Sequence, residues 1–228
     1  MKTVLITGAN RGLGLEFCRK YLALGYYVHA CCRDLTNASN LQSLQCERLG
    51  FHQLDVGSDE SLERLAVELG QENVTIDLLI NNAGICEEQR FGIWSRDKFI
   101  DNLNVNAVGP ALVTQAVYPF LTESSKVVFI SSGLGSIAEN INPDGPFEGY
   151  SMSKACLSVL CQRMSSSTLA KKIQFACVSP GWVKTDMGGE EAPLSARESV
   201  QGMVSVIDQL NFETSGSFFK YDGTTIAW

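Results

Sequence analysis

Two side chains that could cooperate in proton transfer stand one helical turn apart in Y-S-M-S-K, residues 150–154. Tyr150 carries a phenol whose pKa is normally about 10, and Lys154 carries an ammonium group. A neighbouring cation stabilises phenolate, so Lys154 would lower the pKa of Tyr150 and tune it for acid and base work. An isolated pair with this spacing is more often a contact on a solvated helix face, so its meaning depends on the rest of the chain.

A glycine-rich stretch near the N-terminus has the composition of a phosphate-binding turn. The residues T-G-A-N-R-G-L-G, 7–14, follow an apolar run and lead into a helical pattern. Glycines let the chain turn sharply, so that backbone N–H groups and the helix N-terminus can face a pyrophosphate. Such turns also occur for packing alone. We expect this one to bind a dinucleotide through Gly8, Asn10, Arg11, Gly12, Leu13 and Gly14.

The end of the second apolar run, C-C-R-D at 31–34, should identify the nucleotide. An acidic residue there usually binds a free ribose 2′-hydroxyl, whereas arginine binds a 2′-phosphate. Asp34 lies about 20 residues beyond Gly14, which is the spacing of the NAD-type acid. Arg33 precedes it, however, and Arg11 lies beside the same ribose, so two guanidinium groups suit a phosphate dianion. We therefore favour NADP(H) over NAD(H), with an NAD-dependent alcohol dehydrogenase as the alternative should Asp34 dominate.

These residues must be positioned by strands and helices that alternate along the chain. Apolar runs predict strands at 3–7, 26–32, 51–56, 77–81, 126–131, 173–179 and 217–221. Amphipathic patterns predict helices at 12–24, 59–69, 95–121, 150–170 and 195–210, with a weaker one at 37–47. Because the strands are apolar on consecutive positions, both sheet faces should be buried. The pattern predicts an α/β fold: a doubly wound, mostly parallel seven-stranded sheet (Rossmann fold) in a single domain, 1–228.

In such sheets, ligands bind beyond the carboxyl ends of the strands, where the strand order reverses. After the third predicted strand, Asp55 could accept from an adenine amino group and Val56 could line the base pocket, although Asp55 also suits a surface turn. The longest loop, 133–149, is rich in Gly, Pro, Asn and Asp, and loops of that length tend to be functional. Segment 186–194, with two adjacent glycines, is interpreted as a mobile lid. Both loops are expected to shape a substrate entrance.

The chain resembles the short-chain dehydrogenase/reductase family along essentially its whole length. The motifs that carry the resemblance are T-G-A-N-R-G-L-G (7–14), N-N-A-G (81–84), the asparagine of N-V-N-A-V-G (104–109), I-S-S (130–132), Y-S-M-S-K (150–154) and P-G-W-V-K-T (180–185). Each motif is weak alone, but together they stand in the right order and on the right elements. The ending, with P-G-W-V-K-T-D-M-G-G and later Y-D-G-T-T-I-A-W, is most similar to sniffer-type carbonyl reductases and the C-factor group of signalling proteins.

The resemblance implies a role for each catalytic residue. Tyr150 would be the general acid and base, and Lys154 would tune it and hold the nicotinamide ribose. Ser132 would hydrogen-bond the substrate carbonyl, while Ser131 should face the other way because strand side chains alternate. By the same resemblance, the residues expected to line the cofactor are Asn81, Ala83, Gly84, Pro180, Gly181, Val183 and Thr185, besides Tyr150 and Lys154.

Asn106 would complete the family's catalytic tetrad. Pro110 lies four residues later inside a helical pattern and cannot donate to the carbonyl of Asn106. We predict that this carbonyl is freed to bind a water molecule leading toward Lys154, as a proton relay.

The implied function is NADPH-dependent reduction of a small-molecule carbonyl (aldehyde, ketone or quinone). A nucleotide-binding signalling protein of the C-factor type, with little catalysis, is the alternative from another class. A pure binder has no physical need for the four catalytic residues together, and all four are present. Many members of the family pair through their two long helices, so a homodimer, a homotetramer and a monomer all stay open.

Composition and charge narrow the partners. The 228 residues carry a net charge of −7 without a basic run, which argues against nucleic acid and anionic membrane surfaces. The N-terminal apolar run is too short for a secretory signal, and no apolar stretch reaches the roughly 18 residues of a spanning helix. Eight cysteines without a C-x-x-C pair predict free thiols in a reducing cytoplasm.

Side chains that could react or bind metal are interpreted as structural. His29 and His52 stand far from any plausible metal cluster in the sequence, so no metal is expected. Cys86 follows N-N-A-G, but Glu87 and Glu88 would raise the pKa of its thiol, so we expect it to be unreactive.

Overall fold

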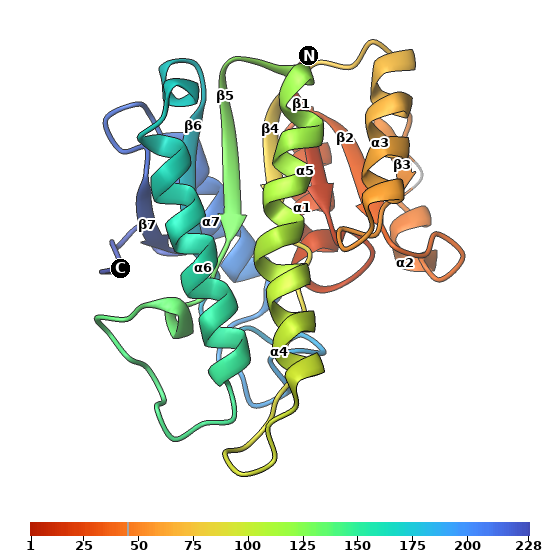
Figure 1. Cartoon of the computed structure of the whole chain (residues 1–228). Helices are drawn as coiled ribbons and strands as arrows, with labels where there is room; N and C mark the ends of the chain where they lie inside the picture. Colours follow the sequence, from red (N-terminus) through yellow and green to blue (C-terminus); the bar gives the residue numbers. More distant parts are fainter. Residues whose placement is uncertain (45) are drawn as a thin grey trace.

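The core of the molecule is one parallel sheet. The computed structural model describes residues 1–44 and 46–228, apart from the side chains of residues 169 and 170. Seven strands pair in parallel in the order β3-β2-β1-β4-β5-β6-β7 (Figure 1). They are β1 (Thr3–Thr7), β2 (Tyr27–Cys32), β3 (Leu49–Gln53), β4 (Ile76–Asn81), β5 (Leu121–Ile130), β6 (Gln174–Ser179) and β7 (Ser217–Lys220). The strand order reverses between β1 and β4, which opens a crevice at their carboxyl ends.

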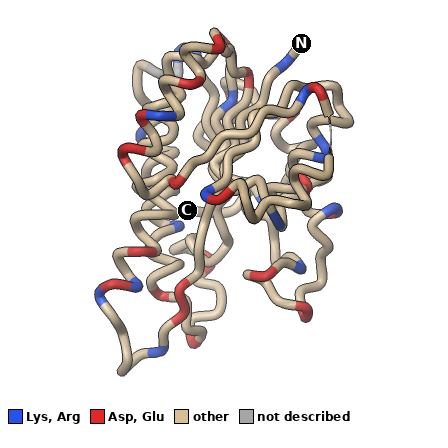
Figure 2. The backbone as a smooth tube through the Cα atoms, turned by 90° about the vertical axis from the view of Figure 1, so that its right-hand side faces the viewer, with Lys and Arg blue, Asp and Glu red and all other residues tan. Residues whose placement is uncertain are grey.

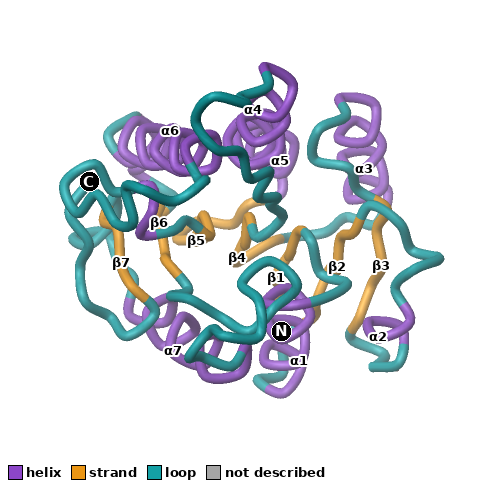
Figure 3. The backbone as a smooth tube through the Cα atoms, turned by 90° about the horizontal axis from the view of Figure 1, so that it is seen from below, coloured by secondary structure: helices purple, strands orange, loops and turns teal. Residues whose placement is uncertain are grey.

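Helices cover both faces of the sheet, as Figure 3 shows in the view along the strands. One face carries α1 (Gly12–Ala23), α2 (Ser39–Gln42) and α7 (Ala196–Gln209), and the other carries α3 (Asp59–Gln71), α4 (Arg96–Leu103), α5 (Gly109–Val117) and α6 (Glu148–Ser165). The doubly wound arrangement predicted from the sequence is therefore confirmed. Among the described residues, no helix combines the length and apolarity that crossing a bilayer requires. Charged residues of both signs are interspersed along the chain in Figure 2.

The apolar strands serve two cores, one on each face of the sheet. In β1, Val4 and Ile6 pack with Phe17 of α1 on one face, and Leu5 packs with Leu65 of α3 on the other. All five side chains are fully buried. Burial of one such side chain stabilises the fold by roughly 1.5–3 kcal/mol, which explains why consecutive strand positions are apolar.

The segment predicted as one helix over 95–121 is divided. Its parts are α4, a π-helical turn (Asn104–Val108), α5 and a 3₁₀ turn (Tyr118–Phe120). Pro110 has no N–H and its ring crowds the preceding turn, so the hydrogen-bond pattern changes there, and the Gly109 N–H donates to the Asn104 carbonyl. The predicted helical segment over 95–121 is confirmed as consecutive helical turns, but their hydrogen-bond type changes just before Pro110.

Other predicted boundaries moved by several residues. Strand β5 begins at Leu121 rather than 126, with an irregular register against β4, and β3 occupies 49–53 rather than 51–56. Of the weak helix predicted at 37–47, only α2 forms, and residue 45 lies outside the described residues. The predicted start of α7 is confirmed, because the Ser195 side chain and Glu198 form a capping box.

Candidate active site

Two cavities meet at the carboxyl ends of the strands. The smaller, about 420 Å³, is lined by the glycine turn after β1 and by the ends of β2 and β4. The larger, about 820 Å³, is lined by segments of 133–149, by the segment after β6 and by residues near the C-terminus. Tyr150, Leu13 and Pro180 are among the residues that line both. The cavities therefore share a wall at the phenol of Tyr150.

The glycine turn is clamped to the end of β4. Thr7 Oγ1 accepts from the N–H groups of Asn82 and Ala83, at 3.0 and 2.9 Å. Asn82 Nδ2 donates to the carbonyls of Thr7 and Gly8 at 2.8 and 3.1 Å. At Gly14, a Cβ atom would lie 2.1 Å from the Gly8 carbonyl oxygen, so only glycine lets α1 begin this close to the turn.

The first turn of α1 suits a bound phosphate. Its N-cap residue, Arg11, makes no side-chain capping bond, and the first turn carries no acidic residue. The N–H groups that begin a helix lack intrahelical acceptors and carry a partial positive charge. Because the turn and the helix start line the smaller cavity, the residues present fit the pyrophosphate of a dinucleotide.

Charged side chains that line the smaller cavity influence which nucleotide it would bind. Arg33, Arg11 and Asp34 all line it. Both carboxylate oxygens of Asp34 are already bonded: Oδ1 accepts from Thr36, and Oδ2 accepts from the Asn37 amide. These bonds lower the pKa of Asp34 and hold its charge against its own loop. Arg33 is thus better placed than Asp34 to meet a group on the ribose, whereas Arg11 is paired with the exposed Asp186.

Tyr150, Lys154 and Ser132 gather where the cavities meet. Lys154 Nζ lies 5.6 Å from the centre of the Tyr150 ring and donates to the Ile130 carbonyl at 2.8 Å. Ser132 follows β5 by two residues and caps the 3₁₀ turn Gly133–Gly135. Burial raises the pKa of the Tyr150 phenol, and a hydrogen bond with Ser132 partly offsets that rise. The hydroxyl of Ser131 is fully buried, so Ser132 presents the available hydroxyl. The turn after Ser132 approaches α6 closely, since a Cβ on Gly135 would lie 2.7 Å from that of Lys154.

Burial determines the protonation states of Tyr150 and Lys154, and the predicted direction of the Tyr150 pKa shift was wrong. Burial first, and then the charge of Cys86, raise the pKa of Tyr150 above its ordinary value, opposite to the predicted lowering by Lys154. Burial also lowers the pKa of Lys154 to about 8. Tyr150 is therefore protonated at neutral pH, which suits a proton donor. Burial and then Glu88 and Glu87 raise the pKa of Cys86 to about 11, so the predicted direction for that thiol is confirmed.

Asn106 joins three elements behind the phenol. Its Nδ2 donates to the Ile85 carbonyl and to Ser153 Oγ, at 2.8 and 2.9 Å, and its Oδ1 accepts from the Ile85 N–H at 2.9 Å. Ser153 Oγ donates in turn to the Tyr150 carbonyl at 2.6 Å. The side chain thus fixes the segment after β4 against α6. The water molecule predicted at the Asn106 carbonyl stays a prediction.

Most residues expected to bind the cofactor line the smaller cavity. They are Gly8, Asn10, Arg11, Gly12, Leu13, Gly14, Arg33, Asp55, Val56, Ala83, Gly84, Tyr150, Lys154, Pro180 and Thr185. Gly181 and Val183 line the larger cavity instead. Asn81 was expected to line the cofactor, but its side chain is buried and donates to Thr114 Oγ1 at 3.2 Å. Asn82 lines the cavity in its place, because neighbouring strand residues face opposite ways.

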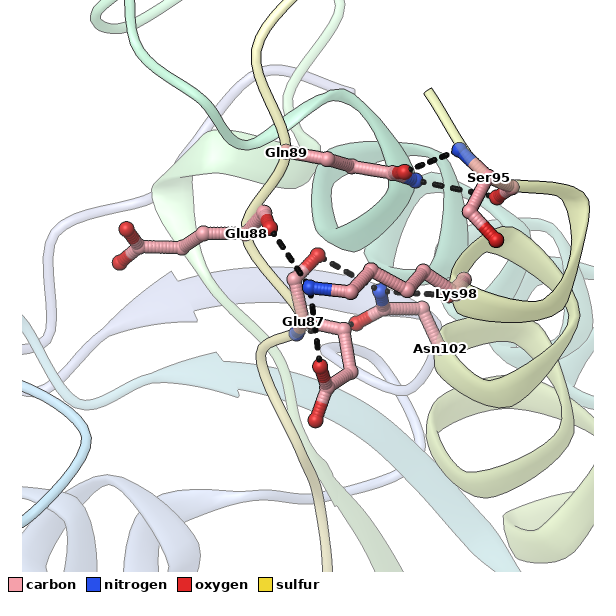
Figure 4. A network of polar contacts seen from close by, with 6 residues as sticks. All are labelled: Glu87, Glu88, Gln89, Ser95, Lys98 and Asn102. Carbon is pink, nitrogen blue, oxygen red and sulfur yellow. Dashed lines mark hydrogen bonds and ion pairs between the residues drawn. The ribbon is translucent and has the colours of Figure 1, made fainter. Parts of the chain in front are cut away.

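A loop held by side-chain hydrogen bonds brings Cys86 and Glu88 to the larger cavity. Gln89 is buried, and its side chain accepts from the Ser95 N–H at 2.6 Å and donates to the Ser95 carbonyl at 3.4 Å. Asn102 Nδ2 donates to the Glu87 carbonyl at 3.3 Å, so the loop is tied to α4 as Figure 4 shows. The Gln89 N–H also donates to the Pro146 carbonyl, which links this loop to 133–149.

Residues near the C-terminus line the larger cavity, which the sequence patterns did not indicate. Thr224, Thr225 and Ile226 line it, as do Ile141 and Phe147 of the predicted entrance loop. The loop and the terminus are joined by backbone and side-chain hydrogen bonds at Ser136 and Ala138. Of segment 186–194, Met187 and Gly188 line the cavity, and Trp182 Nε1 donates to the Gly188 carbonyl at 2.7 Å.

The sheet, the clamped glycine turn and the tyrosine–lysine pair together define a Rossmann-fold oxidoreductase. A family model described as short chain dehydrogenase matches residues 2–194. The chain belongs to this family, as its motifs indicated.

Named relatives agree with that assignment. The chain is 40% identical over 161 residues to C-signal from Myxococcus xanthus, which covers 67% of this chain and 93% of that protein. The NADPH-bound carbonyl reductase from chicken fatty liver has a TM-score of 0.95 at 33% identity, covering 100% of this chain and 99% of that one. Carbonyl reductase Sniffer of D. melanogaster has a TM-score of 0.92 at 30% identity, with both chains covered fully. The resemblance to sniffer-type reductases and the C-factor group is confirmed.

Replacing Gln89 with alanine should loosen the loop at the cavity. The Ser95 N–H would lose its acceptor, and one hydrogen bond contributes about 0.5–1.5 kcal/mol, so its hydrogen exchange should speed up roughly two- to tenfold. Amide exchange of the purified protein measures this directly. Lys98→Ala, which removes an exposed ion pair with Glu87 in the same network, should change the exchange far less. Equal effects of the two variants would contradict the pinning role of Gln89.

Proposed function

We propose that the protein is an NADPH-dependent carbonyl reductase in which Tyr150 is the general acid. The observation that carries the proposal is the position of the Tyr150 phenol, which borders both the nucleotide-shaped cavity and the larger one. A group that gives a proton to a substrate while the substrate receives a hydride must touch both compartments. Tyr150 does so beside Ser132 and Lys154.

Each member of the site has a separable task. NADPH, when bound, supplies the hydride that adds to the carbonyl carbon. Tyr150 gives its proton to the carbonyl oxygen, so an aldehyde or ketone becomes an alcohol. Ser132 donates a hydrogen bond to the same oxygen as negative charge develops on it. Lys154 stabilises the phenolate that remains on Tyr150, because the two groups share a buried site where charge interacts strongly.

Return of a proton to Tyr150 requires a path to solvent. A π-helical turn at Asn104–Val108 interrupts the α-helical hydrogen-bond pattern, and Asn106 lies within that turn. We assign to the Asn106 carbonyl the role of holding a water molecule on the way to Lys154. The hydrogen bonds of the Asn106 side chain would keep that carbonyl in place.

A preference for NADP(H) is supported by the charges that line the smaller cavity. Arg11 and Arg33 can both bind a ribose 2′-phosphate through charge-assisted hydrogen bonds. Asp34, which would favour NAD(H), is engaged by Thr36 and Asn37. The chicken carbonyl reductase, to which the chain is similar, is described with NADPH bound. An NAD-dependent alcohol dehydrogenase is therefore the weaker alternative.

The larger cavity favours a bulky apolar carbonyl compound. Besides Ser132 and Tyr150, its walls include the apolar side chains of Leu134, Ile141, Phe147, Trp182 and Ile226. A volume of about 820 Å³ is in the range of sites for drug-sized ligands. Ketones, quinones and aldehydes with a large hydrocarbon part fit these walls.

A signalling role is the second candidate, and the likeness to C-signal favours it. Such a protein could bind the nucleotide without appreciable turnover. The complete set of Asn106, Ser132, Tyr150 and Lys154 weighs toward catalysis, because binding alone does not need a proton donor. This alternative would be favoured if the purified protein bound NADPH but consumed none with a broad panel of carbonyl compounds.

Substituting Tyr150 with phenylalanine should nearly abolish turnover while leaving NADPH binding almost unchanged. General acid catalysis contributes about 10²–10⁴-fold to a rate, so kcat for carbonyl reduction should fall by that factor. Steady-state kinetics measure the loss, and fluorescence titration measures nucleotide binding. The exposed Tyr118→Phe serves as a control with no expected effect. If Tyr150→Phe retained its kcat, the assignment of the general acid would be wrong.

The reduction rate should fall as pH rises through about 8, the pKa to which burial lowers Lys154. Below that value Lys154 is cationic and stabilises the phenolate left by proton transfer; above it the neutral amine cannot. The measurement is kcat from one pH unit below to one above, with thermal unfolding followed over the same range as a control. A rate that stayed flat while the protein remained folded would contradict this role of Lys154.

Changing Asp186 to asparagine should tighten NADPH binding. Asp186 forms an exposed ion pair with Arg11, so it competes with a 2′-phosphate for the guanidinium group. An exposed pair contributes about 0.2–1 kcal/mol, so the Kd for NADPH should fall by up to about fivefold. NADH, which lacks the phosphate, should bind as before. Glu190→Gln, an exposed change in the same segment, is the control; equal shifts for both nucleotides would refute the competition.

A further inference from the structure

A chain of buried polar groups lies outside the candidate active site, under α3 at one edge of the sheet. His29 Nδ1 and His52 Nε2 are 2.8 Å apart, and His52 Nδ1 lies 2.9 Å from Glu68 Oε2. The two histidines are only 3% and 4% exposed. The expectation that they stand far from any metal cluster was wrong, because parallel pairing of β2 with β3 brings residues 23 positions apart into contact.

Helix α3 adds a second acidic residue to this pair. It covers β2 and β3 in Figure 3, and Glu68 and Glu72 lie one turn apart at its C-terminal end. Ligand atoms of His29, His52 and Glu72 all lie within 4.8 Å of one another. Glu72 is exposed, so the buried imidazoles are connected to solvent on its side.

The acidic residues at the C-terminal end of α3 have no basic residue beside them in the last turn of that helix. The C-terminal end of a helix carries a partial negative charge, and acidic residues there are unfavourable. Glu68 and Glu72 repel each other as like charges at i,i+4, and the last turn of α3 contains no basic residue. A bound cation would relieve each of these features.

We propose that His29, His52 and Glu72 bind a divalent transition-metal ion of the zinc type. Two imidazole nitrogens and one carboxylate are a donor set that suits Zn²⁺ or Co²⁺ rather than Mg²⁺ or Ca²⁺. Glu68 would act as a positioning residue, because ligating histidines commonly donate their other N–H to a carboxylate. The fourth position, facing solvent beside Glu72, would take a water molecule.

To admit the ion the two imidazole rings must turn, because their nitrogens now face each other in a hydrogen bond. Zinc–nitrogen bonds are about 2.0–2.1 Å with tetrahedral angles, so the two nitrogens would also separate by roughly half an ångström. The proton between them would move to the other nitrogen of its ring or to solvent. The ion would then join β2, β3 and the C-terminal end of α3, and would stabilise this edge of the sheet without taking part in reduction.

The test is a metal titration of the full-length protein after treatment with a chelator. Calorimetry with Zn²⁺ should show one saturable site per chain. Glu72→Gln should weaken binding at least tenfold, and Glu68→Gln should weaken it about 10–100-fold, as expected for a partner of a ligating histidine. Glu63→Gln removes the same charge from an exposed position of α3 and should leave the affinity unchanged.

Two further readouts separate this site from the free thiols and from catalysis. Co²⁺ bound here should show visible bands of a nitrogen and oxygen ligand set, without the charge-transfer bands of thiolate ligands, even though the chain has eight free cysteines. Tyr150→Phe should bind Zn²⁺ like the unchanged protein. The proposal is overturned by no saturable binding, by thiolate bands, or by equal affinities of Glu72→Gln and Glu63→Gln.

Discussion

The candidate active site depends on an ammonium group that the fold holds in its interior. Lys154 is 4% exposed, and its contacts include the Ile130 carbonyl, at the end of β5. An ionised group in such surroundings is costly unless it is paired, and the cost appears as a pKa lowered to about 8. What would repay this cost is negative charge that arises during a reaction on the neighbouring phenol. Under the proposed function, Lys154 would stabilise a negative charge that exists only transiently.

Holding Lys154 and Tyr150 there constrains elements that are distant in the sequence. Gly135 lets the turn after β5 approach the backbone of α6, and Asn106 ties α6 to the segment after β4 through Ser153. The same segment begins at Asn82, which fixes the glycine turn of β1. These hydrogen bonds and the segment from Asn82 to Ile85 therefore connect the glycine turn with Tyr150. A change in either part should affect the other, because these contacts are buried or partly buried and specific.

Motifs and periodicity predicted the fold and the centre of the site because those signals are local. The doubly wound parallel sheet follows from alternating elements and right-handed crossovers, and Tyr150 and Lys154 share a face because helical spacing demands it. Other features depend on long-range packing. The sequence could not tell Asn81 from Asn82, since a shift of one residue reverses which face a strand side chain takes. Nor could it bring His29 to His52, because their contact depends on the register between two strands.

Local sequence signals indicate the residues proposed for the reaction, whereas the residues that line the substrate cavity depend on long-range packing. The groups proposed to react lie on α6 and in the turn after β5, beside regular structure, and short motifs suffice to find them. The walls of the larger cavity come from the loop after β4, from 133–149, from the segment after β6 and from the C-terminus. The hydrogen bonds of Gln89 and of Ser136 hold these segments together, and none of them follows a periodic pattern. Under the proposed function, contacts between loops would therefore set the choice of substrate, whereas the scaffold would set the chemistry.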